Sequence, residues 1–125
     1  MSALDDARAH LRKAKEFLEA AELNAELELF NAATSSAVTS GINSKDAICL
    51  ALTGKTAKTE NHADALKELV AAGPSMATHA TSLGRLLKLK NKSQCQTSDV
   101  ARSDALKALD WATKLLAAAS GALAG

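Results

Sequence analysis

The spacing of aliphatic side chains constrains the fold of this chain more than any other feature. Leucine, isoleucine, valine and alanine recur at intervals of three and four residues along most of its length, which is typical of helices that bury one stripe. Aromatic residues make up 2% of the chain and proline occurs once, so few residues favour strands. We therefore expect an all-α fold: a single domain over residues 1–125, an up-and-down antiparallel bundle of about five helices, four long and one short.

The first helix has a well-defined start. Ser2 is a suitable N-cap, and Asp5 and Asp6 follow in the first turn, where the helix dipole favours negative charge. The expected buried stripe of this helix contains Leu4, Ala7, Leu11, Ala14, Leu18 and Ala21.

The second apolar run leaves two alternatives open. Its helical spacing covers residues 26–53, but residues 34–46 are rich in Ser, Thr and Asn and contain Gly41, all weak helix formers. One alternative is a single long helix with Gly54 as its C-cap, and the other is two helices broken near Gly41. The polar residues either line an internal seam or pocket or, as we favour, bond back to their own helix backbone. The apolar run consists of Leu27, Phe30, Thr34, Ala37, Gly41, Lys45, Ile48 and Leu52.

Three further segments complete the expected bundle. A polar loop at 54–60 precedes a short helix at 60–72, which Gly73-Pro74 stops. Ser75 is the expected cap of a helix that runs to about residue 92, and Thr97 or Ser98 the cap of the last helix. Gly84 is expected to mark a close helix contact. The expected inner faces are Ala63, Leu66, Leu69 and Val70, then Met76, His79, Leu83, Leu86, Leu87 and Leu89, and finally Ala105, Leu109, Ala112, Leu116, Ala119 and Leu123.

Motif searches exclude several kinds of site. Gly54-Lys55-Thr56 lacks the upstream glycine and the strand of a phosphate-binding loop. The three histidines are isolated in sequence, and neither Cys49 nor Cys95 has a ligand-type spacing. We therefore expect no metal and no cofactor. The net charge is +1, and no apolar run approaches the length of a membrane span, so we expect a cytoplasmic protein that does not contact a membrane.

The strongest charge signal lies in the fourth helix. No acidic residue occurs between Glu68 and Asp99, and the basic side chains of that interval form a local ridge. Such a ridge either binds the phosphates of RNA or a nucleotide or is simply a solvated helix face. The candidate phosphate-binding residues are Arg85, Lys88, Lys90, Asn91 and Lys92.

The order of segments resembles the HEPN superfamily (higher eukaryotes and prokaryotes nucleotide-binding domains). Residues 30–40, Phe-Asn-Ala-Ala-Thr-Ser-Ser-Ala-Val-Thr-Ser, look like the family's long second helix, whose Gly-capped end is similar to Leu52-Thr53-Gly54. Residues 58–62 look like its Thr/Ser-x-His entry to the next helix, and residues 87–95 are similar to its Leu-x-x-Arg-Asn-x-x-Asp-Tyr segment. Residues 103–112 fit its closing helix. The resemblance covers roughly residues 5–119 and favours the single long second helix.

The departures from the family pattern concern its chemistry. Many members are ribonucleases with an Arg-x(4–6)-His motif, in which the Arg holds phosphate and the His moves a proton. In this sequence Lys90 is at the Arg position, Cys95 is at the aromatic position, and no His follows His79. The resemblance therefore implies the fold more strongly than the activity, and we lean away from an enzyme.

Three hypotheses for function follow. The first is a non-catalytic HEPN-like module that forms a homodimer or docks on a partner such as a nucleotidyltransferase, as in toxin–antitoxin pairs, and binds RNA or a nucleotide through the basic ridge. The second is a purely structural bundle that associates through alanine-rich stripes such as Ala117, Ala118, Ala119 and Ala122. The third is a degenerate ribonuclease that uses His62 or His79.

Overall fold

The computed structural model describes residues 2–57, 61–94 and 96–124. These residues form five α-helices and one 3-10 turn, with no strand, which confirms the all-α bundle. The elements are α1 (Ala3–Glu26), α2 (Phe30–Thr53), α3 (His62–Ala71), η1 (Pro74–Met76), α4 (Ala77–Gln94) and α5 (Arg102–Ala124).

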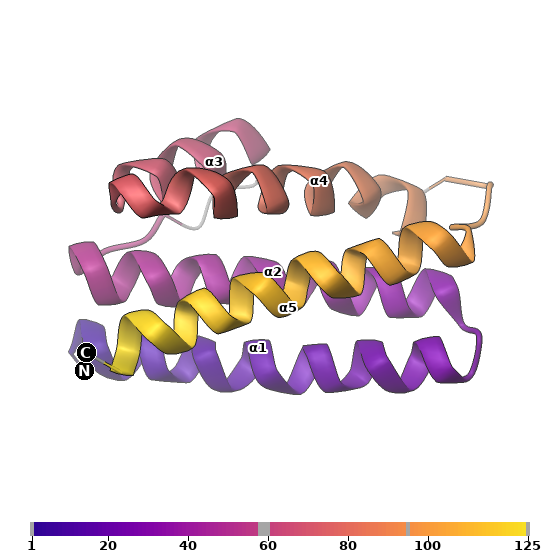
Figure 1. Cartoon of the computed structure of the whole chain (residues 1–125), viewed down its shortest axis with the longest axis horizontal. Helices are drawn as coiled ribbons and strands as arrows, with labels where there is room; N and C mark the ends of the chain where they lie inside the picture. The colour runs from indigo at the N-terminus through magenta and orange to yellow at the C-terminus, as the bar shows by residue number, and fades with distance from the viewer. Residues whose placement is uncertain (1, 58–60, 95, 125) are drawn as a thin grey trace.

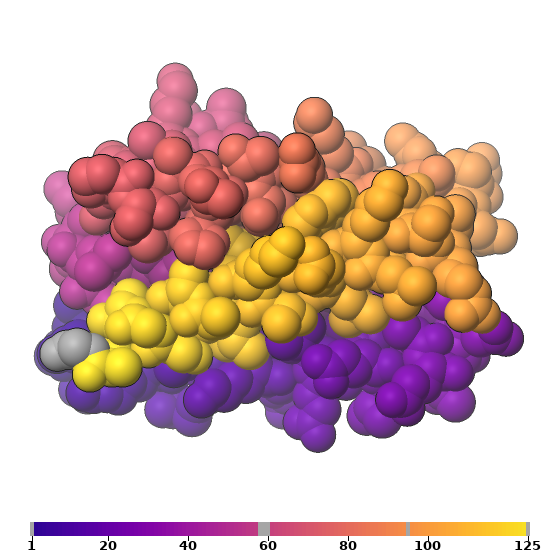
Figure 2. Space-filling model, in the orientation of Figure 1, coloured from indigo at the N-terminus to yellow at the C-terminus, as the bar shows by residue number. Residues whose placement is uncertain are grey.

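Helix α2 lies at the centre of the bundle. It packs against α1, α3, α4 and α5, whereas α3 contacts only α2, η1 and α4. Figure 1 shows α1 and α2 as a long antiparallel pair, with α5 crossing in front of α2 and the α3–α4 pair on the side away from α1. In Figure 2 the side chains of α5 fill the space between α4 and α1 on this face.

The start of α1 is as the sequence predicts. Ser2 forms a capping box in which its Oγ accepts a hydrogen bond from the backbone N–H of Asp5 (3.1 Å), while the Asp5 carboxylate accepts one from the Ser2 N–H. The predicted stripe is confirmed for Ala7, Ala14, Leu18 and Ala21, which are buried. Leu4 was wrongly assigned to the core, because it lies in the first turn and is 47% exposed.

Helix α2 is continuous through Gly41, which resolves the alternatives for this segment in favour of one helix. It starts at Phe30 rather than at residue 26, because Glu28 adopts a positive φ of 61° and ends the preceding helix. Leu27 consequently lies in the connection and is 69% exposed, against expectation. Gly54, with φ of 79°, caps the helix as predicted, and its N–H donates to the carbonyl of Leu50.

The two faces of α2 are built differently. Toward α1 it presents small residues, and the Ser40 hydroxyl donates to the carbonyl of Ala14 across the interface (2.8 Å). Toward α4 and α5 it presents Gly41, at which a Cβ would lie 2.7 Å from Leu86 Cδ1. Small residues recur every seven positions on α1 and every three or four positions on α2, which allows the two helices to approach closely. The buried small residues of this seam are Ala7, Ala14, Ala21, Ala33, Ala37, Ser40, Ser44 and Ala47.

The polar middle of α2 serves both purposes that the sequence left open. Thr39 bonds back to the carbonyl of Ser35, and Asn43 bonds back to that of Thr39. Other polar side chains cross to neighbouring elements: Ser40 reaches α1, and the Ser35 hydroxyl accepts a hydrogen bond from Gln94 of α4. The preference for backbone bonding alone was therefore only partly right.

The later helices differ from expectation mainly at their starts. Ser75 lies inside the η1 turn instead of capping α4, which extends to Gln94. Thr97 and Ser98 cap nothing, because α5 begins at Arg102. The reason is that Asn31 of α2 holds the preceding segment: its amide donates to Asp99 Oδ1 (2.9 Å) and accepts from the Val100 N–H (2.8 Å).

The inner faces of these helices are otherwise close to the prediction. Leu69, Met76, Leu83, Leu86 and Leu87 are buried, as are Ala105, Ala112 and Ala119. Ala63 and Val70 are exposed, contrary to expectation, because α3 packs on one narrow side only. On α5 the buried stripe is rotated, so that Ala108 and Leu115 are fully buried while Leu109, Leu116 and Leu123 are half-buried. Gly84 lies against Leu66 of α3, as the close-contact prediction requires.

Candidate functional site

A charged cluster is buried where α2, α3 and residues 54–57 meet. The Lys45 ammonium lies 3.1 Å from Asp46 Oδ1 and 2.7 Å from Glu68 Oε1. It also donates to Thr56 Oγ1 (3.0 Å) and to the Ala57 carbonyl (3.2 Å). Since an ammonium has three N–H donors, Lys45 is fully engaged by its own chain. We refer to these five residues as the Lys45 cluster.

The electrostatics of the Lys45 cluster favour its charged form. Burial by itself would lower the pKa of Lys45, but the hydrogen bond to Glu68 and the charge of Asp46 outweigh it and raise that pKa above its ordinary value. Burial would likewise raise the pKa of Glu68, yet hydrogen bonds from Lys45, Thr56 and the Ala57 N–H lower it. The ion pairs and hydrogen bonds of the Lys45 cluster therefore hold α3 and residues 54–57 against α2.

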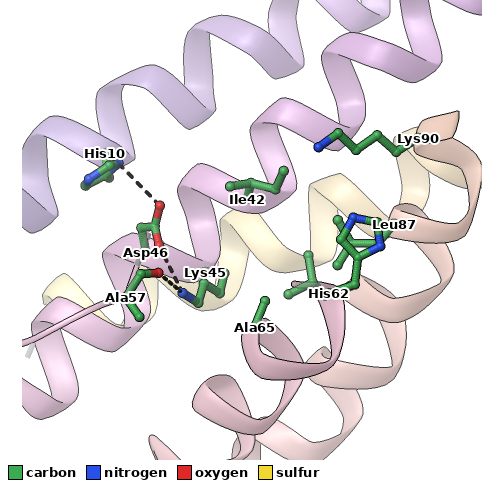
Figure 3. A pocket seen from close by; sticks show the side chains of 10 residues that line it. His10, Ile42, Lys45, Asp46, Ala57, His62, Ala65, Leu87 and Lys90 are labelled. Carbon is green, nitrogen blue, oxygen red and sulfur yellow. Dashed lines mark hydrogen bonds and ion pairs between the residues drawn. The ribbon is translucent and has the colours of Figure 1, made fainter. Parts of the chain in front are cut away.

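A pocket of about 390 Å³ lies beside this cluster, between α1, α2, α3 and α4. Figure 3 shows Lys90 and His62 entering it from one side and Asp46 and His10 standing at the other, with Ile42 between them. We call this the interhelical pocket. Its lining residues are His10, Ile42, Lys45, Asp46, Ala57, His62, Ala65, Leu83, Leu87 and Lys90.

His10 is held in place at the edge of the interhelical pocket. Its Nδ1 lies 2.9 Å from Asn43 Oδ1 and 3.9 Å from Asp46 Oδ2. Because the Asn43 oxygen can only accept, Nδ1 is the protonated nitrogen in this arrangement. Asn43 and Asp46 together fix the orientation of the ring, and they add a second polar contact between α1 and α2 to the hydrogen bond from Ser40 to the Ala14 carbonyl.

The residues of the predicted basic ridge do not all line the same pocket. Arg85 and Lys88 are exposed and line a shallow groove of about 480 Å³ between α4 and α5, whereas Lys90 lines the interhelical pocket. Asn91 is exposed and Lys92 half-buried near the end of α4, and neither lines a described pocket. All five candidate residues lie on α4, but Lys90 lines a different pocket from Arg85 and Lys88.

The groove between α4 and α5 is also lined by residues of α5 that were not among the predicted phosphate-binding residues. Trp111, the only tryptophan of the chain, lines it together with Lys107. Arg85, Lys88 and Lys107 take part in none of the ion pairs found among the described residues. We call this the α4–α5 groove, and it is lined by Arg85, Lys88, Leu89, Asp104, Lys107 and Trp111.

The remaining histidine and the cysteines do not line the interhelical pocket or the α4–α5 groove as far as the described residues show. His79 lies on α4 outside the described pockets, although sequence considerations treated it equally with His62. Burial raises the pKa of the Cys49 thiol to about 12, so this cysteine stays protonated at neutral pH. Cys95 is outside the described residues. Within the described part of the chain, no group of three or more His, Cys, Asp or Glu side chains is arranged to hold a metal ion.

The sequence did not predict the Lys45 cluster, and it did not predict that His10 and His62 line the same pocket. The signal that pointed to the cluster is Lys45-Asp46, a charged pair inside the Ser- and Ala-rich stretch of α2. Charged residues at such a position are seldom buried unless they are paired. Their partners Thr56 and Glu68 come from later segments, so spacing along the chain could not identify them.

The fold and these sites define an all-helical bundle module with cationic pockets on two sides of α4. Among families of this class, the HEPN domain family matches residues 7–122, and the chain therefore belongs to the HEPN family. Membership associates it with helical modules of nucleotide- and RNA-linked proteins. A comparison with individual curated proteins gives no match. None of the helices in the described ranges has the length and hydropathy to cross a membrane.

Proposed function

We propose that this chain is a non-catalytic HEPN module that binds single-stranded RNA along the α4–α5 groove. The observation that carries the proposal is that Arg85, Lys88 and Lys107 line one groove with the single tryptophan, whose side chain packs on the core and is only partly buried. Cations beside an aromatic face suit a nucleic acid strand, because the cations bind phosphates while a base stacks on the ring. Asp104 is the only carboxylate of the groove, so its net charge stays positive.

The sequence also argues against ribonuclease chemistry. The family's ribonuclease motif needs a histidine four to six residues after a phosphate-holding arginine, and this chain has Lys90 at that arginine position and no later histidine. Lysine binds phosphate as a point charge without the bidentate fork of arginine. The absent histidine removes the proton carrier that operates near neutral pH.

Trp111 supplies a direct assay for RNA binding. Stacking of a base on the indole should quench the intrinsic fluorescence, which comes from this residue alone. We expect the double variant Arg85→Gln/Lys88→Gln to weaken binding and to reduce the slope of log K against log salt by about two. The matched control is Arg12→Gln/Lys15→Gln, which removes the same charge from exposed positions of α1.

Two results would contradict this proposal. Equal weakening in both double variants would mean that RNA responds only to total charge, and unchanged Trp111 fluorescence at saturating RNA would exclude stacking. Cleavage of the RNA by the wild-type protein that is lost in His62→Ala would contradict the non-catalytic part and support the degenerate ribonuclease instead.

We also propose that the module acts as a homodimer or with a partner protein such as a nucleotidyltransferase. Three leucines at the end of the α1–α2 pair support a protein contact: Leu23 is 56% exposed, Leu27 69% and Leu29 52%. Neighbouring exposed leucines of this kind are typical of interaction surfaces. Sedimentation at micromolar concentration should give a dimer that Leu27→Glu converts to a monomer. A monomeric wild-type protein would exclude the homodimer and leave the partner protein for co-expression tests.

A further inference from the structure

One face of α1 is basic along its first half and acidic along its second half. The charged residues of this face recur at alternating intervals of four and three, which places their side chains on one side of the helix. All of them are exposed. Helix α1 lies at the edge of the bundle (Figure 1), and among the described elements it packs only on α2 and α5. We call this face the α1 stripe, and it consists of Arg8, Arg12, Lys15, Glu19, Glu22 and Glu26.

This order of charges is unfavourable within α1 itself. Four of the five successive pairs along the α1 stripe have like charges, as in Arg8 and Arg12, and like charges three or four residues apart destabilise a helix. Lys15 and Glu19 are the one pair of opposite sign, and they stand in the less favourable order. Glu26, the last residue of α1, also lies at the negative end of the helix dipole. Helix stability therefore does not account for the α1 stripe.

The rest of the folded chain does not neutralise the α1 stripe either. Within the described ranges its one ion pair joins Arg8 to Asp5 at 3.7 Å, and both side chains are more than half exposed. An exposed pair of this kind contributes little to stability, so Arg8 can exchange Asp5 for a better partner. The other five residues take part in none of the ion pairs found in the described part of the chain.

The α1 stripe is complementary to a second copy of itself. When two α1 helices run antiparallel with Phe17 of both at the twofold axis, every basic residue of the stripe faces an acidic residue of the partner. The axis produces each contact twice. A parallel pair in the same register would instead oppose like charges. The antiparallel pairs are Arg8 with the partner's Glu26, Arg12 with the partner's Glu22, and Lys15 with the partner's Glu19.

Leucines border the α1 stripe on both sides. The helical repeat places Leu4 along one border and Leu23 along the other. Leu4 is 47% exposed and Leu23 is 56% exposed. Because exposed ion pairs alone stabilise a complex only slightly, these leucines supply the apolar surface that association also needs. Leu23 is one of the three leucines at the end of the α1–α2 pair, so the two surfaces are continuous.

We propose that α1 binds the α1 of a second copy of this chain, antiparallel and through the α1 stripe, so that opposite charges set the direction and the register of the homodimer. This inference rests on the homodimer part of the proposed function and specifies its contact surface. Salt screens exposed ion pairs, and at about 1 M the Debye length falls to about 3 Å. The homodimer should therefore be tighter at low salt than at about 1 M salt.

Exchanging charges across the twofold axis tests this register. Arg12→Glu and Glu22→Arg each create two like-charge contacts in the homodimer, and each should weaken dimerisation by about tenfold in sedimentation at low salt. The double variant Arg12→Glu/Glu22→Arg restores both contacts with their signs reversed and should dimerise as the wild type does. The matched control is Lys13→Glu, which makes the same charge change at an exposed position on another side of α1 and should leave dimerisation unchanged.

Several results would overturn this inference. Wild-type affinity in both single variants, or equal weakening in Lys13→Glu, would remove the α1 stripe from the contact. A double variant as weak as the single variants would exclude the register. If Leu27→Glu dissociated the homodimer while the charge variants did not, the leucines alone would form the contact, and the homodimer of the proposed function would stand. A wild-type monomer at low salt would exclude both.

RNA binding is tested separately from this contact. Arg12→Gln/Lys15→Gln should weaken the homodimer, yet it should leave the affinity for a short oligonucleotide that occupies one α4–α5 groove unchanged, because neither residue lines that groove. An unchanged homodimer in this variant would contradict the α1 stripe and not the RNA-binding proposal.

Discussion

Replacing Gly41 by alanine in the middle of α2 has two opposite effects on the free energy of unfolding, one from helix propensity and one from packing. Alanine is the better helix former by about 1 kcal/mol, so an isolated helix would gain stability. In the folded protein the new Cβ would lie 2.7 Å from Leu86 Cδ1 and 3.3 Å from Leu115 Cδ1, and both leucines are fully buried. Overpacking of this kind costs about 1–3 kcal/mol, so we expect a net destabilisation of about 1 kcal/mol.

Urea unfolding followed by circular dichroism at the helical band measures this change directly. A loss of about 1 kcal/mol should also lower the melting temperature by about 3–6 °C for a domain of this size. The control is Gly121→Ala in α5, where a Cβ meets nothing within 4 Å. It should gain up to about 1 kcal/mol from propensity alone. If Gly41→Ala were as stable as the wild type or more stable, the close contact between α2, α4 and α5 would not be limiting, and the packing argument would be wrong.

Three further outcomes are expected from the buried polar groups. Lys45→Met should destabilise the fold by about 3 kcal/mol in urea titrations, because Asp46 and Glu68 would lose their shared cation. If the variant unfolded at the same urea concentration as the wild type, the contacts of Lys45 with Asp46 and Glu68 would contribute nothing to stability. Because hydrogen bonds hold the pKa of Glu68 below its ordinary value of 4.5, its contribution to stability is present above that pH and is lost as the pH falls through the folded-state pKa. Glu68→Gln should therefore flatten the acid side of a stability–pH curve, and an unchanged slope would contradict this. In a Cys95→Ser background, Cys49 should react with a thiol reagent at pH 8 only after unfolding, since burial raises its pKa to about 12; rapid labelling of the native protein would contradict this.

The fold was largely predictable from the sequence because helices depend on local spacing. The Ser2 N-cap and the Gly54 C-cap each involve residues at most four positions apart, and both were identified correctly, although the reciprocal bond from the Asp5 carboxylate was not predicted. The start of α5 was not, because its preceding segment is held by Asn31, which lies nearly seventy residues earlier. Local pattern gives no information about such distant contacts.

The candidate sites were less predictable than the fold for a related reason. Charge along α4 identified Arg85, Lys88 and Lys90, but the rotation of the helix sends Lys90 to a different side of the molecule. Trp111 joins the first two only through the packing of α5 on α4. His10 and His62 line one pocket because α2 brings α1 and α3 to opposite sides of it.

The alanine seam between α1 and α2 has a mechanical consequence. Two helices separated by little more than methyl groups cannot slide or tilt independently, because any shift drives backbone against backbone along their whole length. We therefore expect the pair to move as one rigid unit, and we expect α3, which packs mainly on α4 and only lightly on α2, to be the least restrained helix of the bundle.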